Sequence, residues 1–329
     1  MKVLITDGIN DGGKIEKKIF GNKFKIIIPK INQINNISNE LWSNVDGILT
    51  FDSLNFDRRI ISNLKKCKII VRIGTGFDNI DLEETKKKKI IVSNVPDYGI
   101  DEVSDHAMSL LLALNRDIFN LVEKTKLGIW KRTGGDILRM EGKTIGIIGL
   151  GRIGSAMAIK AKAFKMKVIF FDPYKDNGYD KIYNIKRVDT LRDLAKYSDF
   201  ISLHCPLTKE TKNLINENFF KYSKKNSIII NTSRGAVIDL VSLRNALVHK
   251  KIKAAGLDVL PEEPPSNNNL LIKDFYENKI YLRNKLIITP HVAFYSNTSI
   301  IEIRKKAAIE MKTVLQGGRA KNCVNNFYE

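Results

Sequence analysis

Short apolar runs alternate with helix-like segments along the first hundred residues. Each run has the length of a buried strand and is followed by a polar or helix-forming stretch. Alternation of this kind predicts βα units and a parallel sheet. The five predicted strands are KVLIT at 2–6, KIII at 25–28, VDGILTF at 45–51, KIIVRI at 68–73 and IIVSN at 90–94.

A second series of apolar runs follows a predicted long helix. The helix is expected from about Asp101 to Lys126, where apolar residues recur at helical spacing. The series begins at Lys143, and its strands describe a doubly wound parallel sheet of the Rossmann kind. The six predicted strands are TIGIIG, MKVIFF, FISLH, SIIIN, AAGLDV and LIIT.

Two α/β domains are predicted from this order of elements. After His291 the pattern returns to one helix, 296–315, which cannot form a domain alone and is expected to dock onto the first domain. The substrate domain is therefore expected to be discontinuous and flavodoxin-like, with residues 1–102 plus 296–329, and the Rossmann domain to comprise residues 103–295. We expect the chemistry in the cleft between these domains.

The turn after the first strand of the second series has the spacing GxGxxG. Gly149 permits the tight turn, Gly151 lets the backbone approach a pyrophosphate, and Gly154 lets the following helix pack on the strand. The amides of Arg152 and Ile153, at the start of that helix, are expected to face the phosphates. Because the motif lies between a predicted strand and a predicted helix, it indicates a dinucleotide site.

An aspartate ends the next predicted strand, MKVIFFDPY. Asp172 lies where a carboxylate hydrogen-bonds the adenosine ribose and repels a 2′-phosphate. No arginine follows it directly, so the sequence favours NAD over NADP. The alternative interpretation is structural, with Asp172 merely ending a strand before Pro173.

Charged residues also follow later strands of the second sheet, where open α/β sheets bind ligands. SIIINTSRG carries Arg234, AAGLDVLPEEP carries Asp258 and Glu263, and LIITPH carries His291. An arginine grips a carboxylate and stabilises charge that develops on the adjacent carbonyl oxygen. A histidine supported by a carboxylate transfers the proton. With a hydride from nicotinamide, these groups suffice to reduce a 2-oxo acid.

Each of these residues has a structural interpretation when taken alone. His291 could cap a turn, Arg234 could pair with an acid, and Glu262 or Glu263 could be a solvated loop charge. Their joint placement after a dinucleotide motif favours catalysis. Of the remaining histidines, His204 follows a predicted strand and is expected on the adenosine side of the site. His106 and His249 are expected to be helix residues without a special role.

Composition and charge narrow the class of protein. The chain has 329 residues, 43% of them hydrophobic, and no apolar run near the roughly 20 residues of a membrane helix; MKVLITDG lacks the features of a secretory signal. The three cysteines, Cys67, Cys205 and Cys323, have no metal-binding or disulfide spacing, which favours a cytoplasmic protein without a metal. The net charge of +19 is spread over the chain, so we expect a solvated basic surface and neither a nucleic-acid nor a membrane partner.

Several motifs, in order GLGRIG, FDPY, HCPLTKETKNLIN, NTSRGAVID, GLDVLPEEP and TPH, resemble those of the D-isomer-specific 2-hydroxyacid dehydrogenases, and the likeness covers nearly the whole chain. By position it implies Arg234, Glu263 and His291 as catalytic residues. Glu263 is preferred over Glu262 because it directly precedes the proline. The likeness also implies NAD, a 2-oxo or 2-hydroxy acid substrate and a homodimer formed by the cofactor domain. The implied cofactor contacts are Thr75, Arg152, Ile153, Asp172, Cys205, Thr232, Arg234, His291 and Asp258, the last on the nicotinamide carboxamide.

A narrower likeness, in VRIGTGFDNID, NVPDYGIDEVSDHA and HVAFYSNTSIIEIR, is to the C-terminal binding protein branch and its bacterial relatives. It implies that Arg72 reaches the substrate carboxylate, beside amides of the loop 73–76, which is suited to bind an anion. Phe294 stands where animal members carry a tryptophan, so the aromatic wall is kept and the indole N–H is lost. The implied substrate contacts are Arg72, Ile73, Gly74, Thr75 and Phe294.

Three functions remain open from the sequence. The preferred one is an NAD-dependent 2-oxo acid reductase whose substrate has an apolar or modest side chain, as Phe77, Tyr98 and Phe294 suggest. A phosphoglycerate dehydrogenase would need basic residues for a phosphate, and Arg72 alone is thin support for that. An NADH-sensing, corepressor-like binding protein would have no need of all three catalytic side chains.

Overall fold

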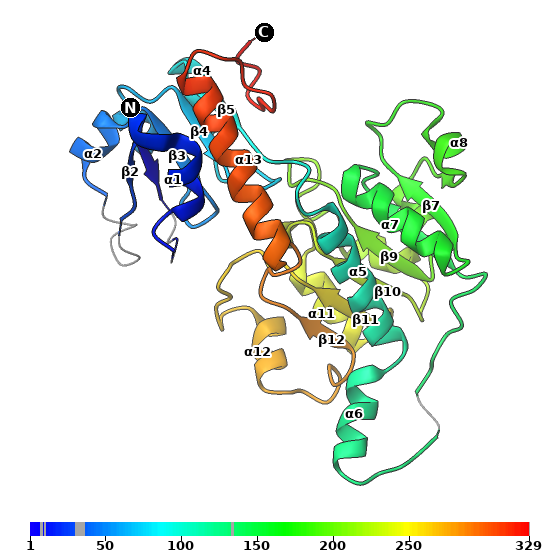
Figure 1. Cartoon of the computed structure of the whole chain (residues 1–329). Helices are drawn as coiled ribbons and strands as arrows, with labels where there is room; N and C mark the ends of the chain where they lie inside the picture. The colour runs from blue at the N-terminus through cyan, green and yellow to red at the C-terminus, as the bar shows by residue number, and fades with distance from the viewer. Residues whose placement is uncertain (7–8, 10, 30–36, 133–134, 329) are drawn as a thin grey trace. The chain divides into compact units, whose positions relative to one another are not determined.

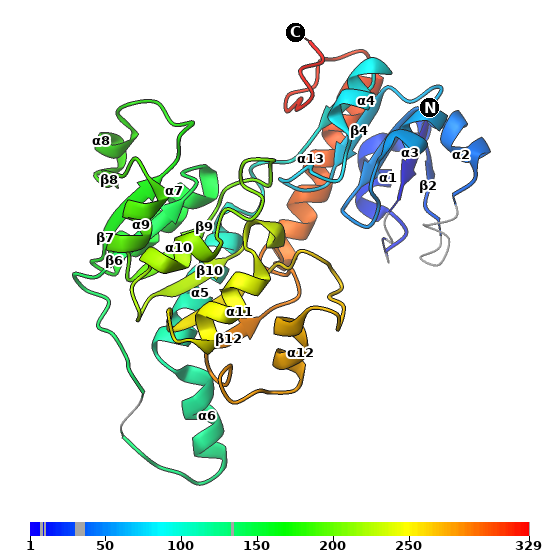
Figure 2. The ribbon, with the colours of Figure 1, turned by 180° about the vertical axis from the view of Figure 1, so that it is seen from behind.

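The structure is a computed structural model that describes residues 1–6, 9, 11–29, 37–132 and 135–328. The chain folds into two compact units. Unit 1 comprises residues 1–99 and 295–329, and unit 2 comprises residues 100–294. Each unit is built around one parallel sheet with helices on its faces (Figures 1 and 2). Among the described residues, no helix is long and apolar enough to span a membrane.

Unit 1 contains a five-stranded sheet in the order β2-β1-β3-β4-β5, which is the flavodoxin order. One hydrophobic cluster covers the face that carries α1 and α13, and a second covers the face that carries α2 and α3. The strands are β1 Lys2–Ile5, β2 Lys25–Ile27, β3 Gly47–Thr50, β4 Ile69–Arg72 and β5 Ile91–Ser93. The helices are α1 Lys14–Phe20, α2 Asn39–Asn44, α3 Arg58–Asn63, α4 Leu82–Lys87 and α13 Asn297–Leu315.

The C-terminal helix α13 packs on the sheet of unit 1, far from that sheet in sequence. Its residues Ile303, Ala307 and Met311 are fully buried. A Cβ on Gly47 of β3 would lie 2.3 Å from the sulfur of Met311, so helix and strand are in direct contact. Arg304 adds an ion pair to the buried Glu16 of α1 at 2.7 Å. These contacts make α13 part of the core that shapes β3 and β4.

Unit 2 contains a seven-stranded sheet in the order β12-β11-β10-β9-β6-β7-β8, with every pair parallel. The order reverses at β6, as in doubly wound dinucleotide-binding sheets. The strands are β6 Thr144–Ile148, β7 Lys167–Phe171, β8 Lys186–Arg187, β9 Phe200–Leu203, β10 Ile228–Asn231, β11 Ala254–Leu257 and β12 Leu286–Ile288. The helices are α5 Ile100–Asn115, α6 Ile118–Lys126, α7 Arg152–Ala163, α8 Tyr179–Tyr183, α9 Leu191–Tyr197, α10 Glu217–Tyr222, α11 Leu240–Val248 and α12 Leu270–Tyr276. The predicted fold class is therefore confirmed.

Two details of unit 2 differ from the prediction. The single helix predicted from Asp101 to Lys126 is wrong, because Asp117 adopts a left-handed backbone with φ 56° and separates α5 from α6. The sheet has seven strands where six were predicted. The missed strand, β8, has only the two polar residues Lys186 and Arg187 and offers no apolar run to recognise.

Candidate active site

The glycine-rich turn between β6 and α7 leaves space where a pyrophosphate would bind. Gly149 has φ +89°, and a Cβ on it would lie 2.7 Å from the backbone nitrogen of Cys205. A Cβ on Gly154 would lie 2.1 Å from the carbonyl oxygen of Gly149. At Gly151, by contrast, nothing lies within 4 Å of the Cβ position. Since Gly151 caps α7, which begins at Arg152, this open space borders the N-terminus of the helix and fits a phosphate group.

Asp172, directly after β7, is held by the same turn. Its Oδ2 accepts a hydrogen bond from the amide of Leu150 at 2.8 Å, and its Oδ1 accepts one from the amide of Tyr174 at 3.0 Å. Each carboxylate oxygen keeps a further acceptor position for a ribose hydroxyl. Arg187 donates to the carbonyls of Asp172 and Lys175 at 3.0 and 2.8 Å, so its guanidinium is engaged in holding this loop.

Buried polar groups further along the same edge also fit a cofactor. The hydroxyl of Thr232 is buried and has no hydrogen-bond partner among the described residues, which is costly unless a ligand supplies one. Burial raises the pKa of the Cys205 thiol to about 12, so this thiol is neutral. His204 is neutral too, since burial lowers its pKa to about 3, and its Nε2 lies 2.8 Å from the Ser202 hydroxyl.

Arg234 lies on the loop after β10, at the start of the short helix Gly235–Val237. The Asn231 side-chain amide donates to the Arg234 carbonyl at 2.9 Å, and Arg234 Nη1 donates to the carbonyl of Ser233 at 2.9 Å. A Cβ on Gly235 would lie 1.8 Å from the backbone carbonyl carbon of Leu260. The loop after β10 therefore packs directly on the loop after β11, which carries the acid described next.

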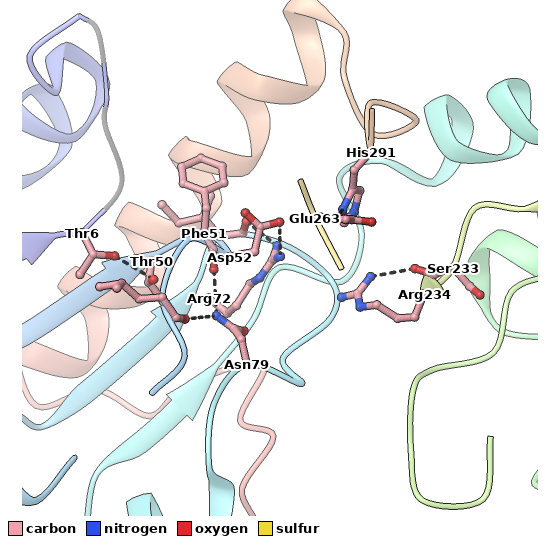
Figure 3. Close-up of polar contacts among 12 residues, drawn as sticks. Thr6, Thr50, Phe51, Asp52, Arg72, Asn79, Ser233, Arg234, Glu263 and His291 are labelled. Atoms are coloured by element: carbon pink, nitrogen blue, oxygen red, sulfur yellow. Dashed lines mark hydrogen bonds and ion pairs between the residues drawn. The ribbon is translucent and has the colours of Figure 1, made fainter. Parts of the chain in front are cut away.

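Glu263 and His291 form a close pair. His291 Nδ1 lies 2.6 Å from Glu263 Oε2, and the Leu260 amide donates to Glu263 Oε1 at 2.7 Å. Burial raises the pKa of Glu263, but the hydrogen bond and charge of His291, the Leu260 amide and the charge of Arg234 together bring it below its ordinary value. The ionised carboxylate favours a proton on Nδ1 and leaves Nε2 for a reacting group. Figure 3 shows the Arg234 guanidinium and this pair extending toward one another from separate loops.

Asp258 fixes the loop that carries His291. Its carboxylate is 1% exposed and accepts hydrogen bonds from the Thr289 hydroxyl at 2.6 Å and from the amides of Val292 and Ala293 at 3.0 and 2.9 Å. The backbone carbonyl of Asp258 accepts from the His291 amide at 2.7 Å. These bonds hold His291 at φ +51°, a backbone conformation that non-glycine residues rarely adopt.

His106 of α5 supports the same loop. Its Nε2 lies 3.0 Å from the Thr289 hydroxyl and 3.5 Å from Asp258 Oδ1. The interpretation of His106 as a helix residue without a special role therefore needs correction. The sequence carries no direct signal for this contact, because 183 residues separate His106 from Thr289.

Phe294 stands beside the Glu263 and His291 pair. Its ring meets the His291 ring edge to face, with the ring centres 6.2 Å apart and the planes at 87°. The contact gives the imidazole an apolar neighbour on one side. Among the described residues, no cluster of three or more His, Cys, Asp or Glu side chains could hold a metal ion.

A second cluster lies within unit 1, at the end of β4. Arg72 is 7% exposed, its Nη1 donates to the Ile73 carbonyl at 2.8 Å, and its Nη2 lies 3.4 Å from Asp52 Oδ2 (Figure 3). A Cβ on Gly74 would lie 1.3 Å from Arg72 Nη1, so only glycine leaves room for the guanidinium there. Thr75 is exposed on the same loop. The roles that the resemblance implies for these residues stay predictions.

Known proteins resemble this chain over most of its length. Residues 108–293 match the NAD binding domain of the D-isomer specific 2-hydroxyacid dehydrogenases. The chain is 36% identical to the D-3-phosphoglycerate dehydrogenase of Methanocaldococcus jannaschii over 99% of its own length and 59% of that protein. It is 36% identical to the glyoxylate reductase of Thermococcus litoralis over 85% of its own length and 84% of that protein.

A solved structure gives the same result. The D-lactate dehydrogenase of Aquifex aeolicus, complexed with NAD and lactic acid, superposes with a TM-score of 0.83 and 28% identity, covering 96% of each chain. The chain belongs to the D-isomer specific 2-hydroxyacid dehydrogenase family. The predicted family, the oxidoreductase class and the NAD binding domain are confirmed. The narrower likeness to the C-terminal binding protein branch stays a prediction.

Proposed function

We propose that this chain is an NAD-dependent D-2-hydroxyacid dehydrogenase that interconverts a small 2-oxo acid and its 2-hydroxy acid. The observation that carries the proposal is the pair formed by His291 and an ionised Glu263, with the Arg234 charge acting on that carboxylate. A sensor that only binds NADH needs no acid held against a histidine. The chain spans 59% of the phosphoglycerate dehydrogenase that it resembles, so that relative does not decide the substrate.

In the proposed mechanism, unit 2 supplies the groups that act on the reacting carbon. When bound, reduced NAD would supply the hydride. His291 donates a proton from Nε2 to the carbonyl oxygen, and Glu263 stabilises the imidazolium before transfer. Arg234 stabilises the negative charge that develops on the same oxygen. In the direction of oxidation, His291 accepts the proton from the hydroxyl group.

The cofactor is assigned to the open side of the glycine turn. Gly149, Gly151, Gly154 and the amides of Arg152 and Ile153 would hold the pyrophosphate, and Asp172 would hold the adenosine ribose. The buried hydroxyl of Thr232 would hydrogen-bond the cofactor, and the side chain of Cys205 would pack against it. Asp258 would use its remaining acceptor position for the nicotinamide carboxamide.

The substrate carboxylate is assigned to Arg72 of unit 1, beside the loop of Ile73, Gly74 and Thr75. The amides of Ile73 and Gly74 donate to the carbonyls of Thr50 and Arg72 at 2.6 and 2.9 Å, so the amide assigned to the anion is that of Thr75. Three features of the structure support this assignment. The guanidinium is fixed by its bond to the Ile73 carbonyl, and it lies over Gly74. Arg72 itself ends β4, at the carboxyl edge of a parallel sheet. Thr75 would also contact the cofactor. Phe294 would border the substrate side chain.

We also propose that the protein is a cytoplasmic homodimer. Helix α6 and the residues after it expose an unusual number of apolar side chains, which would be covered by a second copy. The exposed fractions are 45% for Ile118, 54% for Phe119, 45% for Val122, 76% for Leu127 and 80% for Trp130. Sedimentation of the protein and of a Trp130→Asp variant tests this, since only the variant should be shifted toward monomer. Three free cysteines, two of them buried, suit a reducing compartment.

Steady-state kinetics tests the activity. Initial rates should be measured with NADH and with NADPH on glyoxylate, pyruvate, hydroxypyruvate and 3-phosphohydroxypyruvate. The proposal expects turnover of at least one 2-oxo acid, with NADH preferred, and a D-configured product by chiral chromatography. Tight NADH binding without turnover of any of them would favour the sensor, and a preference for the phosphorylated acid would favour a phosphoglycerate dehydrogenase.

A further inference from the structure

We propose that Asp52 selects the charge of the substrate. With Arg72 it forms a pair without net charge, which favours 2-oxo acids with a single negative charge over those that carry a second anionic group. This inference rests on the proposed function and narrows its substrate class. It assigns a role to a residue that no motif of the sequence singles out.

The two side chains come from neighbouring strands of unit 1. Arg72 ends β4, and it is in register with Thr50 at the end of β3. Asp52 follows β3 by two residues, so it lies at the same edge of the sheet. Its Oδ2 is 3.4 Å from Arg72 Nη2, and the exposed fractions of the two side chains are 56% for Asp52 and 8% for Arg72. An anion that reaches Arg72 therefore also meets the Asp52 carboxylate.

The Arg72 guanidinium and the backbone on both sides of Asp52 are held in place. The guanidinium of Arg72 is tied to the Ile73 carbonyl and occupies the space over Gly74. The loop with Asp52 is held by Asn79, whose side-chain amide donates to the carbonyls of Phe51 and Leu54 at 3.3 and 2.9 Å, on both sides of Asp52 in sequence. The guanidinium and the backbone that carries Asp52 are thus held by contacts that do not depend on the ion pair itself.

The side chains labelled beside the ion pair in Figure 3 from unit 1 carry no positive charge. Those labelled in Figure 3 from unit 1, other than the ion pair, are Thr6, Thr50, Phe51 and Asn79, and all are neutral. Thr6 and Thr50 bond each other at 2.8 Å. Among these labelled side chains of unit 1, Arg72 is the cation, and it is already engaged by the substrate carboxylate when a phosphate or a second carboxylate meets Asp52.

Electrostatics sets the size of the effect. A carboxylate about 6 to 8 Å from a second anionic group, in partly screened surroundings, disfavours that group by about fivefold per unit charge. A phosphate carries nearly two charges at neutral pH, so we expect a total of about tenfold or more. The repulsion between Asp52 and the shared carboxylate is the same for both kinds of substrate and cancels in their ratio, so a 2-oxo acid with one carboxylate avoids only the penalty on the second group.

The test uses two substrates that differ only by a phosphate group. The ratio of kcat/KM for hydroxypyruvate to that for 3-phosphohydroxypyruvate should favour hydroxypyruvate in the wild-type enzyme. Asp52→Asn should lower this ratio by about tenfold. The control Glu141→Gln removes the same charge from a residue with 58% side-chain exposure, ahead of the amino end of β6, and should leave the ratio unchanged.

Two results would overturn the inference. One is a wild-type preference for the phosphorylated acid, and the other is an Asp52→Asn variant that changes both rates by the same factor, as a purely structural ion pair would. A protein without any turnover contradicts the proposed function instead. Calorimetric binding of D-glycerate and 3-phosphoglycerate in the presence of NADH then measures the same ratio, and an unchanged ratio in the folded variant would likewise overturn the role of Asp52.

Discussion

A carboxylate faces a basic side chain at the carboxyl edge of each sheet, but the two pairs differ in what they can do. In unit 2, Glu263 lies 2.6 Å from the imidazole of His291, a ring that can both donate and accept a proton. In unit 1, Asp52 lies 3.4 Å from a guanidinium, which stays protonated. The first pair can move a proton, whereas the second can only tune the binding of an anion. Similar edges of similar sheets therefore suit chemistry in one unit and selection in the other.

The two arginines differ in the same sense. Arg72 is buried, ends a strand and lies against the backbone of its own loop. Arg234 lies on a loop packed against the segment that carries Glu263, and its charge is one of the groups that lower the pKa of that carboxylate. We therefore assign Arg72 to binding of the substrate carboxylate and Arg234 to stabilisation of the transition state. Variants of these residues should separate the two roles.

The largest effect is expected for His291→Ala. Removing the proton donor should lower kcat by about a thousandfold or more, because proton transfer by a positioned side chain contributes up to about 10⁴-fold. NADH binding, followed by the fluorescence of the bound nicotinamide, should change little. A variant that keeps more than a tenth of the wild-type kcat would show that His291 is not the proton donor.

The arginine pair should give the next largest effects. Arg234→Ala should lower kcat by about 10² to 10³-fold, because it removes stabilisation of developing charge. Arg72→Ala should mainly raise KM, by about 10 to 100-fold, because it removes binding that is the same before and during the reaction. Steady-state kinetics with both Lys variants as controls measures the split. The reverse pattern would exchange the two assignments.

Glu263→Gln should act on the pH profile. The pKa of Glu263 lies below its ordinary value, so its support for His291 is present at neutral pH and is lost only as the pH falls through that lowered pKa. The variant loses this support at every pH. We expect the rate of reduction to fall by about tenfold and the alkaline limb of the pH–rate profile to move to lower pH. An undisplaced limb, measured between pH 5 and 9 in steps of about half a unit, would mean that Glu263 does not stabilise the imidazolium.

The smallest effect is expected for His106→Ala. The ring bonds Thr289, which bonds Asp258, so it acts on His291 only through the loop. We expect kcat to fall by about three- to tenfold with KM nearly unchanged, and His106→Asn to recover part of the loss by bonding Thr289. Loss of thermal stability without a change in kcat would show that His106 serves the fold alone.

Much of this arrangement could be predicted from local patterns. Strands such as β6 and β10 are short apolar runs, and the spacing of Gly149, Gly151 and Gly154 defines a turn whose geometry depends on neighbouring residues. The break of the long helix could not be predicted, because the left-handed backbone of Asp117 lies within a continuous apolar period. Helical spacing of apolar residues continues past Asp117, so this spacing predicts one helix where the structure has two.

Contacts between segments that are distant in sequence could not be predicted either. Asp258 was predicted only as a cofactor contact, yet its carboxylate holds the loop of His291 through Thr289, Val292 and Ala293. The ion pair of Asp52 with Arg72 joins two strands that are adjacent in the sheet. Both contacts depend on strand order and register, which the pattern of apolar residues does not specify.

The most direct test of the account is a crystal structure of the protein with NADH and oxamate, an unreactive analogue of a 2-oxo acid. The account predicts that the oxygen of the amide carbonyl lies within about 3 Å of both His291 Nε2 and a guanidinium nitrogen of Arg234, with Glu263 still bonded to Nδ1. An analogue bound at the glycine turn or on unit 1 alone, with His291 and Arg234 opening onto separate surfaces, would contradict it.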